Sequence, residues 1–115
     1  MTPDGQAAFI HRVASENPAS GGTKILWSTH AVQKLVSEGL GRLEVEAAIG
    51  RGELIESYPG SRRGLPACLV LAFLAGGGPI HAVIGTDGPR DRILMITVYR
   101  PSEERWQNDW KTRKF

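Results

Sequence analysis

The strongest apolar stretch of the chain runs from Ile93 to Val98, and Pro101 follows it closely. Several of its residues are β-branched, and an apolar run of this length closed by a proline is typical of a strand buried on both faces. Pro101 has no N–H to donate to a neighbouring strand, so we expect the strand to end there. Thr97, Tyr99 and Arg100 bring polar groups to this end, where a buried strand can hold them at the rim of a cleft.

Three further strands are predicted before this run. Residues 53–58 mix apolar and acidic side chains, residues 67–74 are apolar throughout, and residues 80–85 follow a turn of three glycines. The step from Asp87 to Gly88 then indicates a hairpin turn into the last strand. Because short connections keep consecutive strands adjacent in space, the pattern predicts a four-stranded antiparallel sheet.

Apolar residues with helical spacing precede these strands. Residues 30–38 place four apolar side chains on one stripe, Gly39 supplies a stop signal, and residues 43–49 form a second helix. Two short helices joined by a tight turn make an αα-hairpin. Residues 24–28, ahead of the first helix, indicate a short strand or an extended lead-in.

A last helix is predicted after Pro101. Ser102 can cap its N-terminus, and Trp106 and Trp110 are four residues apart, so they would share one face of the helix. We expect the two indole rings to cover the sheet, and base stacking is the alternative role.

Together these elements predict an α+β fold in which an αα-hairpin is followed by a four-stranded antiparallel sheet and a C-terminal helix. We expect a single α+β domain over residues 24–115. Residues 1–23 are expected to be an N-terminal extension, because their apolar content is thin. This extension is either a short helix from Pro3 to about Glu16 or partly disordered.

Charge is unevenly distributed along the chain. The formal net charge is +2, but residues 90–115 hold seven basic and four acidic residues, a net of +3, whereas residues 24–60 hold four basic and five acidic residues, a net of −1. This asymmetry gives modest support to a polyanion partner such as RNA. The candidate RNA-binding residues are Arg62, Arg63, Arg105 and Arg113. For the first two, the alternative is an exposed, solvated pair in a loop.

Cysteine content and motifs argue against several classes of protein. Cys68 is the single cysteine, so it cannot form an internal disulfide, and no apolar run approaches the length of a membrane span. The first residues lack the pattern of a secretory signal, so we expect a cytoplasmic protein that does not contact a membrane. The chain has no CxxC, HExxH, acidic calcium loop or phosphate loop, and we expect neither a metal nor a cofactor.

Three side chains carry candidate chemistry, namely His30 at the start of the first core helix, His81 in the third strand and Tyr99 at the end of the fourth. The predicted hairpin pairs His81 with a residue in the range 96–99, so the register decides whether His81 and Tyr99 share a face. An imidazole moves protons at neutral pH, a phenol donates or accepts a hydrogen bond, and Arg100 can grip a phosphate. The alternatives are structural: a hydrogen-bonded core histidine, a histidine at a helix cap, and a tyrosine that packs its ring.

Several segments occur in an order that resembles a known family. They are Thr29-His30-Ala31 before a helix, residues 52–59 after a second helix, Pro79-Ile80-His81-Ala82-Val83 in a strand, and residues 96–101 ahead of Trp106. In this order they resemble the domain of unknown function 4258 family of small, mostly bacterial proteins, over about residues 24–113. That family in turn resembles the toxin ribonucleases of the RelE and BrnT kind, which implies cleavage of RNA without metal and a partner antitoxin.

The first hypothesis is a toxin-like, metal-independent endoribonuclease. In it, His81 would act as the general base and His30 as the general acid. Tyr99 would orient the phosphate or stack on a base, and Arg100 or Arg105 would stabilise developing charge. The second hypothesis is a non-catalytic RNA- or protein-binding module on the same sheet, in which His81 and Tyr99 are structural. A third, a dimerising structural protein, depends on exposure of Trp27 or of the strand edges.

Overall fold

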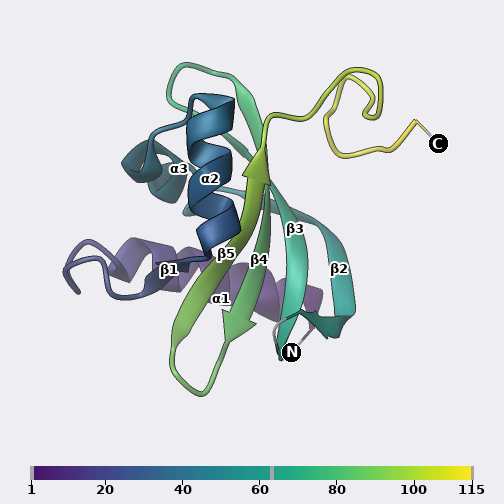
Figure 1. The fold of residues 1–115 in the computed structure, drawn as a ribbon. Helices are drawn as coiled ribbons and strands as arrows, with labels where there is room; N and C mark the ends of the chain where they lie inside the picture. Colours follow the sequence, from purple (N-terminus) through teal and green to yellow (C-terminus); the bar gives the residue numbers. More distant parts are fainter. Residues whose placement is uncertain (1, 63, 115) are drawn as a thin grey trace.

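The computed structural model describes residues 2–62 and 64–114, but not the side chains of residues 59–62. Within these ranges the chain forms three helices and one five-stranded sheet (Figure 1). No helix in this part of the chain is long and apolar enough to cross a membrane. The predicted α+β class is confirmed, and the layout differs from the prediction at one edge of the sheet and at the C-terminus.

The predicted run of four antiparallel strands is present, and a fifth strand extends it. β2 (Glu53–Arg62), β3 (Leu65–Phe73), β4 (Pro79–Asp87) and β5 (Arg92–Tyr99) pair antiparallel in chain order. β1 (Ile25–Trp27) lies parallel to β5 at the opposite edge, so the sheet is mixed and its order is β1-β5-β4-β3-β2. A strand of three residues is too short to produce an alternating pattern, and pairing with β5 and burial of Ile25 fix it here.

The predicted αα-hairpin is also present. α2 (Thr29–Glu38) begins after Ser28, whose hydroxyl accepts a backbone N–H of the first turn at 3.0 Å. It ends at Gly39, whose φ of 65° lies in the left-handed region that favours glycine. α3 (Arg42–Ile49) follows directly. α2 packs along β5, so its C-terminal end lies beside the end of that strand (Figure 1).

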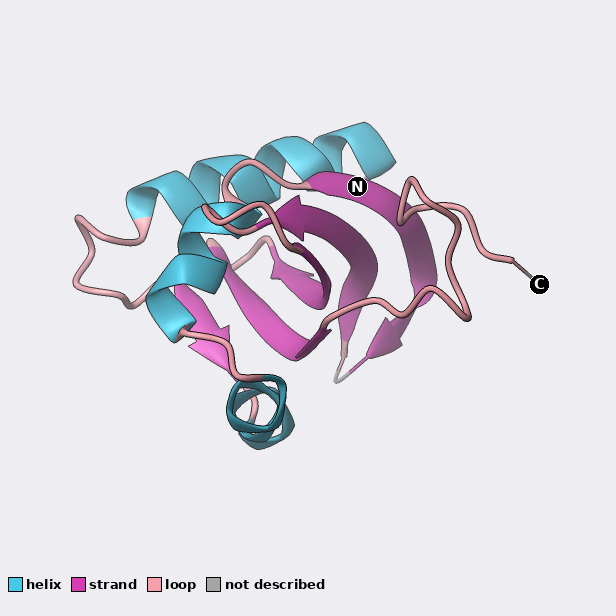
Figure 2. Ribbon diagram, turned by 90° about the horizontal axis from the view of Figure 1, so that it is seen from above, coloured by secondary structure: helices cyan, strands magenta, loops and turns pink. Residues whose placement is uncertain are grey.

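α1 (Pro3–Glu16) has the bounds that the sequence predicts for a short helix. Its Ile10 and Val13 are buried in the same core as the inner face of the sheet. Arg12 forms an ion pair with Asp91 at 2.5 Å, which ties the helix to the turn between β4 and β5. Figure 2 shows α1 lying along one face of the sheet.

The two faces of the sheet are covered by different parts of the chain. On the face toward the helices lies the main core, to which β4 and β5 contribute Ile84 and Met95. On the opposite face, a smaller cluster that includes Val83 packs around Trp106. His81 is two residues before Val83 on β4, so it points to this second face. The second face therefore carries the predicted chemistry.

The predicted C-terminal helix is wrong. The chain turns back on itself after β5, and Trp106 forms an isolated antiparallel bridge with Arg113. Two backbone hydrogen bonds support this bridge, from Gln107 N–H to the Thr112 carbonyl at 2.9 Å and from Lys114 N–H to the Arg105 carbonyl at 3.0 Å. We call residues 105–114 the C-terminal hairpin. It covers one end of the second face of the sheet, and Trp106 is only 3% exposed there.

Local turn chemistry explains why no helix forms. The carboxylate of Asp109 accepts the backbone N–H groups of Lys111 and Thr112, both at 3.0 Å, and this reverses the chain. Trp110 has a φ of 62°, which a right-handed helix does not allow. The four-residue spacing of the tryptophans fits a helix, but the turn and the burial of Trp106 outweigh it.

Candidate functional site

His81 and Tyr99 meet across neighbouring strands. They are partners in the antiparallel register of β4 and β5, so their side chains lie on the same face. The Tyr99 hydroxyl oxygen is 3.1 Å from Nδ1 of His81, and the two rings meet edge to face with their centroids 5.3 Å apart. The shared face on which the enzymatic hypothesis depends is therefore present.

The imidazole of His81, however, is sealed from solvent. Its exposed fraction is 0%, and the ring of Trp106 lies perpendicular to it with the centroids 4.4 Å apart. Its Nε2 is 2.6 Å from the carbonyl oxygen of Trp110, which can only accept a hydrogen bond, so Nε2 carries a proton. In the neutral ring, Nδ1 is then the acceptor of the Tyr99 hydroxyl proton.

Burial also sets the protonation of this pair. It lowers the pKa of His81 below its ordinary value, although the bond to Trp110 and the charge of Glu56 work in the opposite direction. Burial likewise raises the pKa of Tyr99. Both groups are therefore neutral at neutral pH. The role expected for His81, a general base in direct contact with substrate, does not fit a sealed ring whose two nitrogens are both in use.

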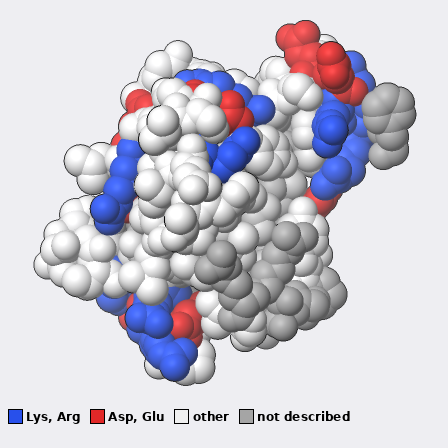
Figure 3. All heavy atoms as spheres, viewed as in Figure 1, with Lys and Arg blue, Asp and Glu red and all other residues white. Residues whose placement is uncertain are grey.

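A cleft of about 320 Å³ opens beside Tyr99, between the C-terminal end of α2 and the C-terminal hairpin. Its lining includes four basic side chains, one acidic side chain and a phenol: Lys34, Arg100, Arg105, Arg113, Glu38 and Tyr99. Figure 3 shows basic side chains on the C-terminal hairpin and on the neighbouring surface near the upper end of α2. Four cations against one carboxylate give the cleft a mainly basic lining.

Three of the four cations already have partners within the protein. Arg100 donates from Nε to the carbonyl oxygen of Glu38 at 3.1 Å, and so it caps the C-terminal end of α2. Arg113 makes two hydrogen bonds, of 2.7 and 2.9 Å, to the carboxylate of Glu56 on β2. Lys34 lies 3.6 Å from the carboxylate of Glu38. These cations contribute their field to the cleft, but their donors are partly occupied.

Arg105 differs from the other three. Its side chain is exposed, and its guanidinium has no hydrogen bond or ion pair to any residue that the structure describes. Its backbone is nevertheless held, because its N–H donates to the Ser102 carbonyl at 3.2 Å and its carbonyl accepts from Lys114. A free guanidinium on a fixed backbone can grip a phosphate with two parallel hydrogen bonds.

His30 lies away from this cleft. It is exposed near the start of α2, and its Nε2 is 3.0 Å from the hydroxyl oxygen of Thr97 on β5. Among the described residues that line the cleft, neither His30 nor His81 is present. The structure therefore does not bring the two histidines together at one substrate-accessible site, although the sequence analysis paired them as acid and base.

The predicted RNA-binding arginines divide into two groups. Arg105 and Arg113 line the cleft together with Arg100, which the sequence analysis assigned to catalysis. The side chain of Arg62 and the whole of Arg63 lie outside the described part of the chain.

Sequence reasoning missed three residues of the site, Lys34, Glu38 and Glu56, and one backbone group. Lys34 lines the cleft because α2 packs along β5, and its i,i+4 spacing to Glu38 indicates only an ordinary surface pair. Glu56 orients Arg113 from a position 57 residues away, and nothing in the sequence links the two. The Trp110 carbonyl reaches His81 because of a turn that the predicted helix left out.

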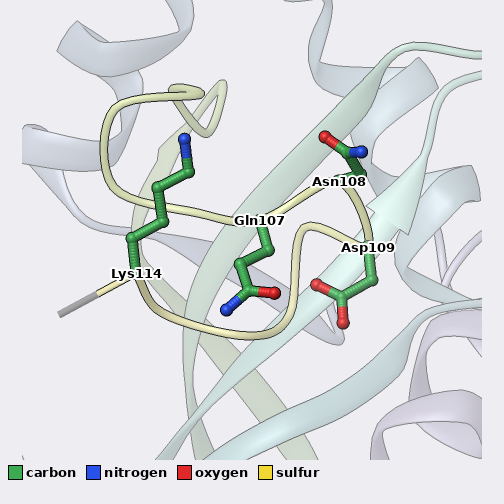
Figure 4. Close-up of a pocket in the computed structure, with 4 residues that line it drawn as sticks. All are labelled: Gln107, Asn108, Asp109 and Lys114. Carbon is green, nitrogen blue, oxygen red and sulfur yellow. The ribbon is translucent and has the colours of Figure 1, made fainter.

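A second hollow, of about 740 Å³, is formed by the C-terminal hairpin itself (Figure 4). Its labelled residues are Gln107, Asn108, Asp109 and Lys114, and their side chains do not converge on one point in Figure 4. The Asp109 carboxylate accepts three hydrogen bonds from the turn. This hollow is therefore a consequence of the turn.

Neither a cluster of metal ligands nor an ionised thiol is present among the described residues. They include no group of three or more His, Cys, Asp or Glu side chains that could hold a metal ion. Cys68 is fully buried, and burial raises the pKa of its thiol to about 12, so it stays protonated at neutral pH.

Comparison with known proteins identifies the family. A family model described as domain of unknown function (DUF4258) matches residues 27–100. The chain belongs to this family. The match includes His30, His81, Tyr99 and Arg100, and it ends before the C-terminal hairpin, which supplies Arg105. No curated protein and no solved structure matches the chain, and the comparisons give no support to the further resemblance to RelE and BrnT toxins.

Proposed function

We propose that this DUF4258 protein binds RNA through the cationic cleft beside Tyr99. The observation that carries the proposal is the guanidinium of Arg105, which no described residue binds, in a cleft that also holds a phenol ring and three further cations. Cations that follow a phosphate backbone, together with an aromatic ring on which a base can stack, are the usual means of binding single-stranded nucleic acid.

The shape of the site favours unpaired RNA over a duplex. A cleft of about 320 Å³ can take a splayed, unpaired nucleotide, whereas a rigid helix cannot enter it. In the proposed complex Arg105 grips a phosphate, and Lys34 adds a mobile point charge from α2. The guanidinium of Arg113 lies over the ring of Trp106, with its Cζ atom 4.6 Å from the ring centroid.

The state of His81 favours binding over acid–base catalysis by the two histidines. A catalytic base must come within hydrogen-bond reach of the proton that it removes. His81 is buried, with one nitrogen at the Trp110 carbonyl and the other at the Tyr99 hydroxyl. Its place in the proposed function is to orient Tyr99.

A second candidate, a metal-independent endoribonuclease, is favoured by one specific observation. The Trp110 carbonyl, His81 and the Tyr99 hydroxyl form a hydrogen-bonded chain that ends in the cleft. In such a reaction Tyr99 oxygen takes the 2′-hydroxyl proton of the ribose while its own proton passes to His81 Nδ1. The 2′-oxygen then attacks phosphorus, the bond from phosphorus to the 5′-oxygen breaks, and a 2′,3′-cyclic phosphate forms. The departing 5′-oxygen takes a proton from water, and the hydroxide that remains is neutralised by the proton that His81 returns through Tyr99.

In this second candidate the protein is toxin-like, and its partner is an antitoxin that covers the cleft. Arg105 would then serve both ligands, because an antitoxin that blocks the cleft would present carboxylates to the same cation. The non-catalytic candidate needs no such inhibitor. Co-expression with the product of a neighbouring short reading frame separates the two: rescue of growth supports the toxin, and no toxicity of the protein alone opposes it.

Binding is tested with a fluorescently labelled, unstructured RNA in buffer that contains EDTA, followed by fluorescence anisotropy. The wild type is expected to bind, and Arg105→Ala is expected to weaken binding about tenfold, because a charge-assisted bidentate contact is lost. Arg51→Ala is the matched control, since Arg51 is an exposed arginine at the end of α3 that donates to the Ala47 carbonyl, away from the cleft. Absence of RNA binding by the wild type would refute the proposal.

Cleavage is tested on the same samples by denaturing gel. Intact RNA in the wild-type sample supports the non-catalytic candidate. Cleavage that survives EDTA and disappears in Tyr99→Phe supports the second candidate, because Tyr99→Phe keeps the ring and removes the hydroxyl. Equal cleavage by the wild type and Tyr99→Phe indicates a contaminating nuclease and contradicts the second candidate.

A further inference from the structure

Tyr99 belongs to two environments. Its side chain lines the cationic cleft, and its hydroxyl oxygen lies 3.1 Å from Nδ1 of the buried His81. The hydroxyl carries a single proton, which can point either inward to His81 or outward to a ligand in the cleft. An anion beside Tyr99 therefore competes with a titratable group for that proton.

We infer that the cleft is a proton-coupled site for a tetrahedral oxyanion, the class that includes sulfate and the phosphates of RNA, in which protonation of His81 turns the Tyr99 hydroxyl toward the anion. The inference rests on the proposed function, because it concerns the same cleft. It adds a regulation by pH that RNA binding alone does not require.

The direction of the coupling follows from the hydrogens. Nε2 of His81 keeps its proton in both charge states, since it faces the Trp110 carbonyl oxygen at 2.6 Å. In the neutral ring Nδ1 accepts the Tyr99 proton, whereas in the imidazolium ion Nδ1 donates to the Tyr99 oxygen. The Tyr99 O–H then needs another acceptor, and an oxyanion in the cleft provides it.

The groups packed around His81 set the balance. β2 presents Glu56, whose charge favours the imidazolium, and the C-terminal hairpin presents Arg113, whose charge opposes it. β3 contributes the apolar Leu71 as the pairing partner of His81, and β5 contributes Tyr99. Burial opposes the imidazolium most strongly. The neutral state therefore dominates when the cleft is empty.

An anion changes this balance from the other side of Tyr99. The cleft walls carry Lys34 and Glu38 from α2, and Arg105 and Arg113 from the C-terminal hairpin. An oxyanion held among them offsets the positive charge that opposes protonation of His81 and accepts the released Tyr99 proton. By linkage, protonation of His81 must then strengthen anion binding by the same factor.

The test follows the His81 imidazole by NMR in the full-length protein, with sodium sulfate compared with sodium chloride at equal ionic strength. Sulfate keeps one charge state over the pH range in which histidine titrates, so a change in binding reports on the protein. We expect sulfate to move the His81 titration to higher pH and to bind about tenfold more tightly when His81 is protonated than when it is neutral.

Two variants make the test specific. Tyr99→Phe keeps the ring and removes the hydroxyl, so sulfate is expected to lose most of its effect on the His81 titration. His30→Gln removes the exposed imidazole near Thr97, and the coupling is expected to persist in this variant. Equal sulfate shifts in the wild type and in Tyr99→Phe would overturn the inference, because the hydroxyl would then play no part.

A short RNA oligonucleotide provides the second arm. A shift of the His81 titration with both sulfate and RNA assigns the site to RNA phosphates, whereas a shift with sulfate alone assigns it to free oxyanions. No shift with either ligand overturns the inference. If RNA binding at neutral pH still depends on Arg105 in that case, the proposed function stands although the coupling has failed.

Discussion

Nε2 of His81 lies 2.6 Å from the carbonyl oxygen of Trp110, so a buried imidazole on β4 fastens the C-terminal hairpin to the sheet. The ring of Trp106 packs against the same imidazole, and Arg113 reaches across to Glu56 on β2. These contacts hold Arg105 and Arg113 where they line the cleft. The positions of Arg105 and Arg113 in the cleft therefore depend on His81, although His81 is buried and does not line the cleft.

The first prediction concerns this anchor. His81→Ala leaves a cavity and removes the partner of the Tyr99 hydroxyl and of the Trp110 carbonyl. We expect the free energy of unfolding to fall by about 2–4 kcal/mol, measured by urea denaturation. His30→Ala is the control, and because its side chain is exposed we expect a change within about 0.5 kcal/mol. A neutral His81→Ala would contradict the anchoring role.

The second prediction concerns pH. Burial lowers the pKa of His81 in the folded state, so below the ordinary histidine pKa the unfolded chain binds a proton more readily than the folded one. The stability that comes from neutral His81 is fully present above the ordinary histidine pKa. It declines as the pH falls from that pKa toward the lower pKa of His81 in the folded protein. We expect stability to fall by up to about 1.4 kcal/mol per pH unit in this window. Urea midpoints of the wild type and His81→Gln, in chloride buffer, measure the difference, and equal slopes would contradict it.

The third prediction concerns the close packing of Gly52. A Cβ atom at this position would lie 2.5 Å from Cγ1 of Val70 and 3.2 Å from a backbone oxygen, so the start of β2 would have to move. We expect Gly52→Ala to reduce the free energy of unfolding by about 1–3 kcal/mol. Gly76→Ala, where nothing lies within 4 Å, is the control and should be nearly neutral. Thermal unfolding of both variants gives the comparison.

The fourth prediction concerns the ion pair between Arg113 and Glu56. Glu56→Gln keeps the shape of the side chain and removes its charge, so the C-terminal hairpin should dock less firmly. We expect a loss of about 1 kcal/mol or less, because Arg113 is half exposed, and an increase in tryptophan quenching by acrylamide. Glu53→Gln, at the more exposed pair with Lys111, should change neither quantity measurably. Unchanged quenching in Glu56→Gln would oppose a role for this pair in docking.

Patterns that are repeated along the chain predicted the fold well. The apolar stripe before Gly39 gave α2, and the apolar runs on either side of the glycine turn gave β3 and β4. The Asp-Gly turn limited the predicted partner of His81 to residues 96–99, and the structure shows that this partner is Tyr99. In each case several residues share the same apolar pattern, so a single exception does not change the predicted element.

The site was harder to predict, because it depends on single contacts between distant residues. Trp106 and Trp110 have helical spacing, but the turn at Asp109 and the packing of Trp106 on the sheet prevent a helix from forming. The alternative given for His81, a hydrogen-bonded core histidine, agrees with its burial, but the C-terminal hairpin that covers it was predicted as a helix. Lys34 and Arg105 share a cleft through packing of α2 on β5, for which the sequence has no local signal.

The most direct test of the account is the affinity of the protein for an unstructured RNA after charge reversal at the cleft. The account predicts that Arg105→Glu weakens binding by more than tenfold and lowers the dependence of log K on log salt, since a phosphate contact is lost. Arg51→Glu carries the same change of charge outside the cleft and should bind nearly as the wild type does. Equal weakening by the two variants would mean that RNA responds only to net charge, and it would contradict the cleft as the binding site.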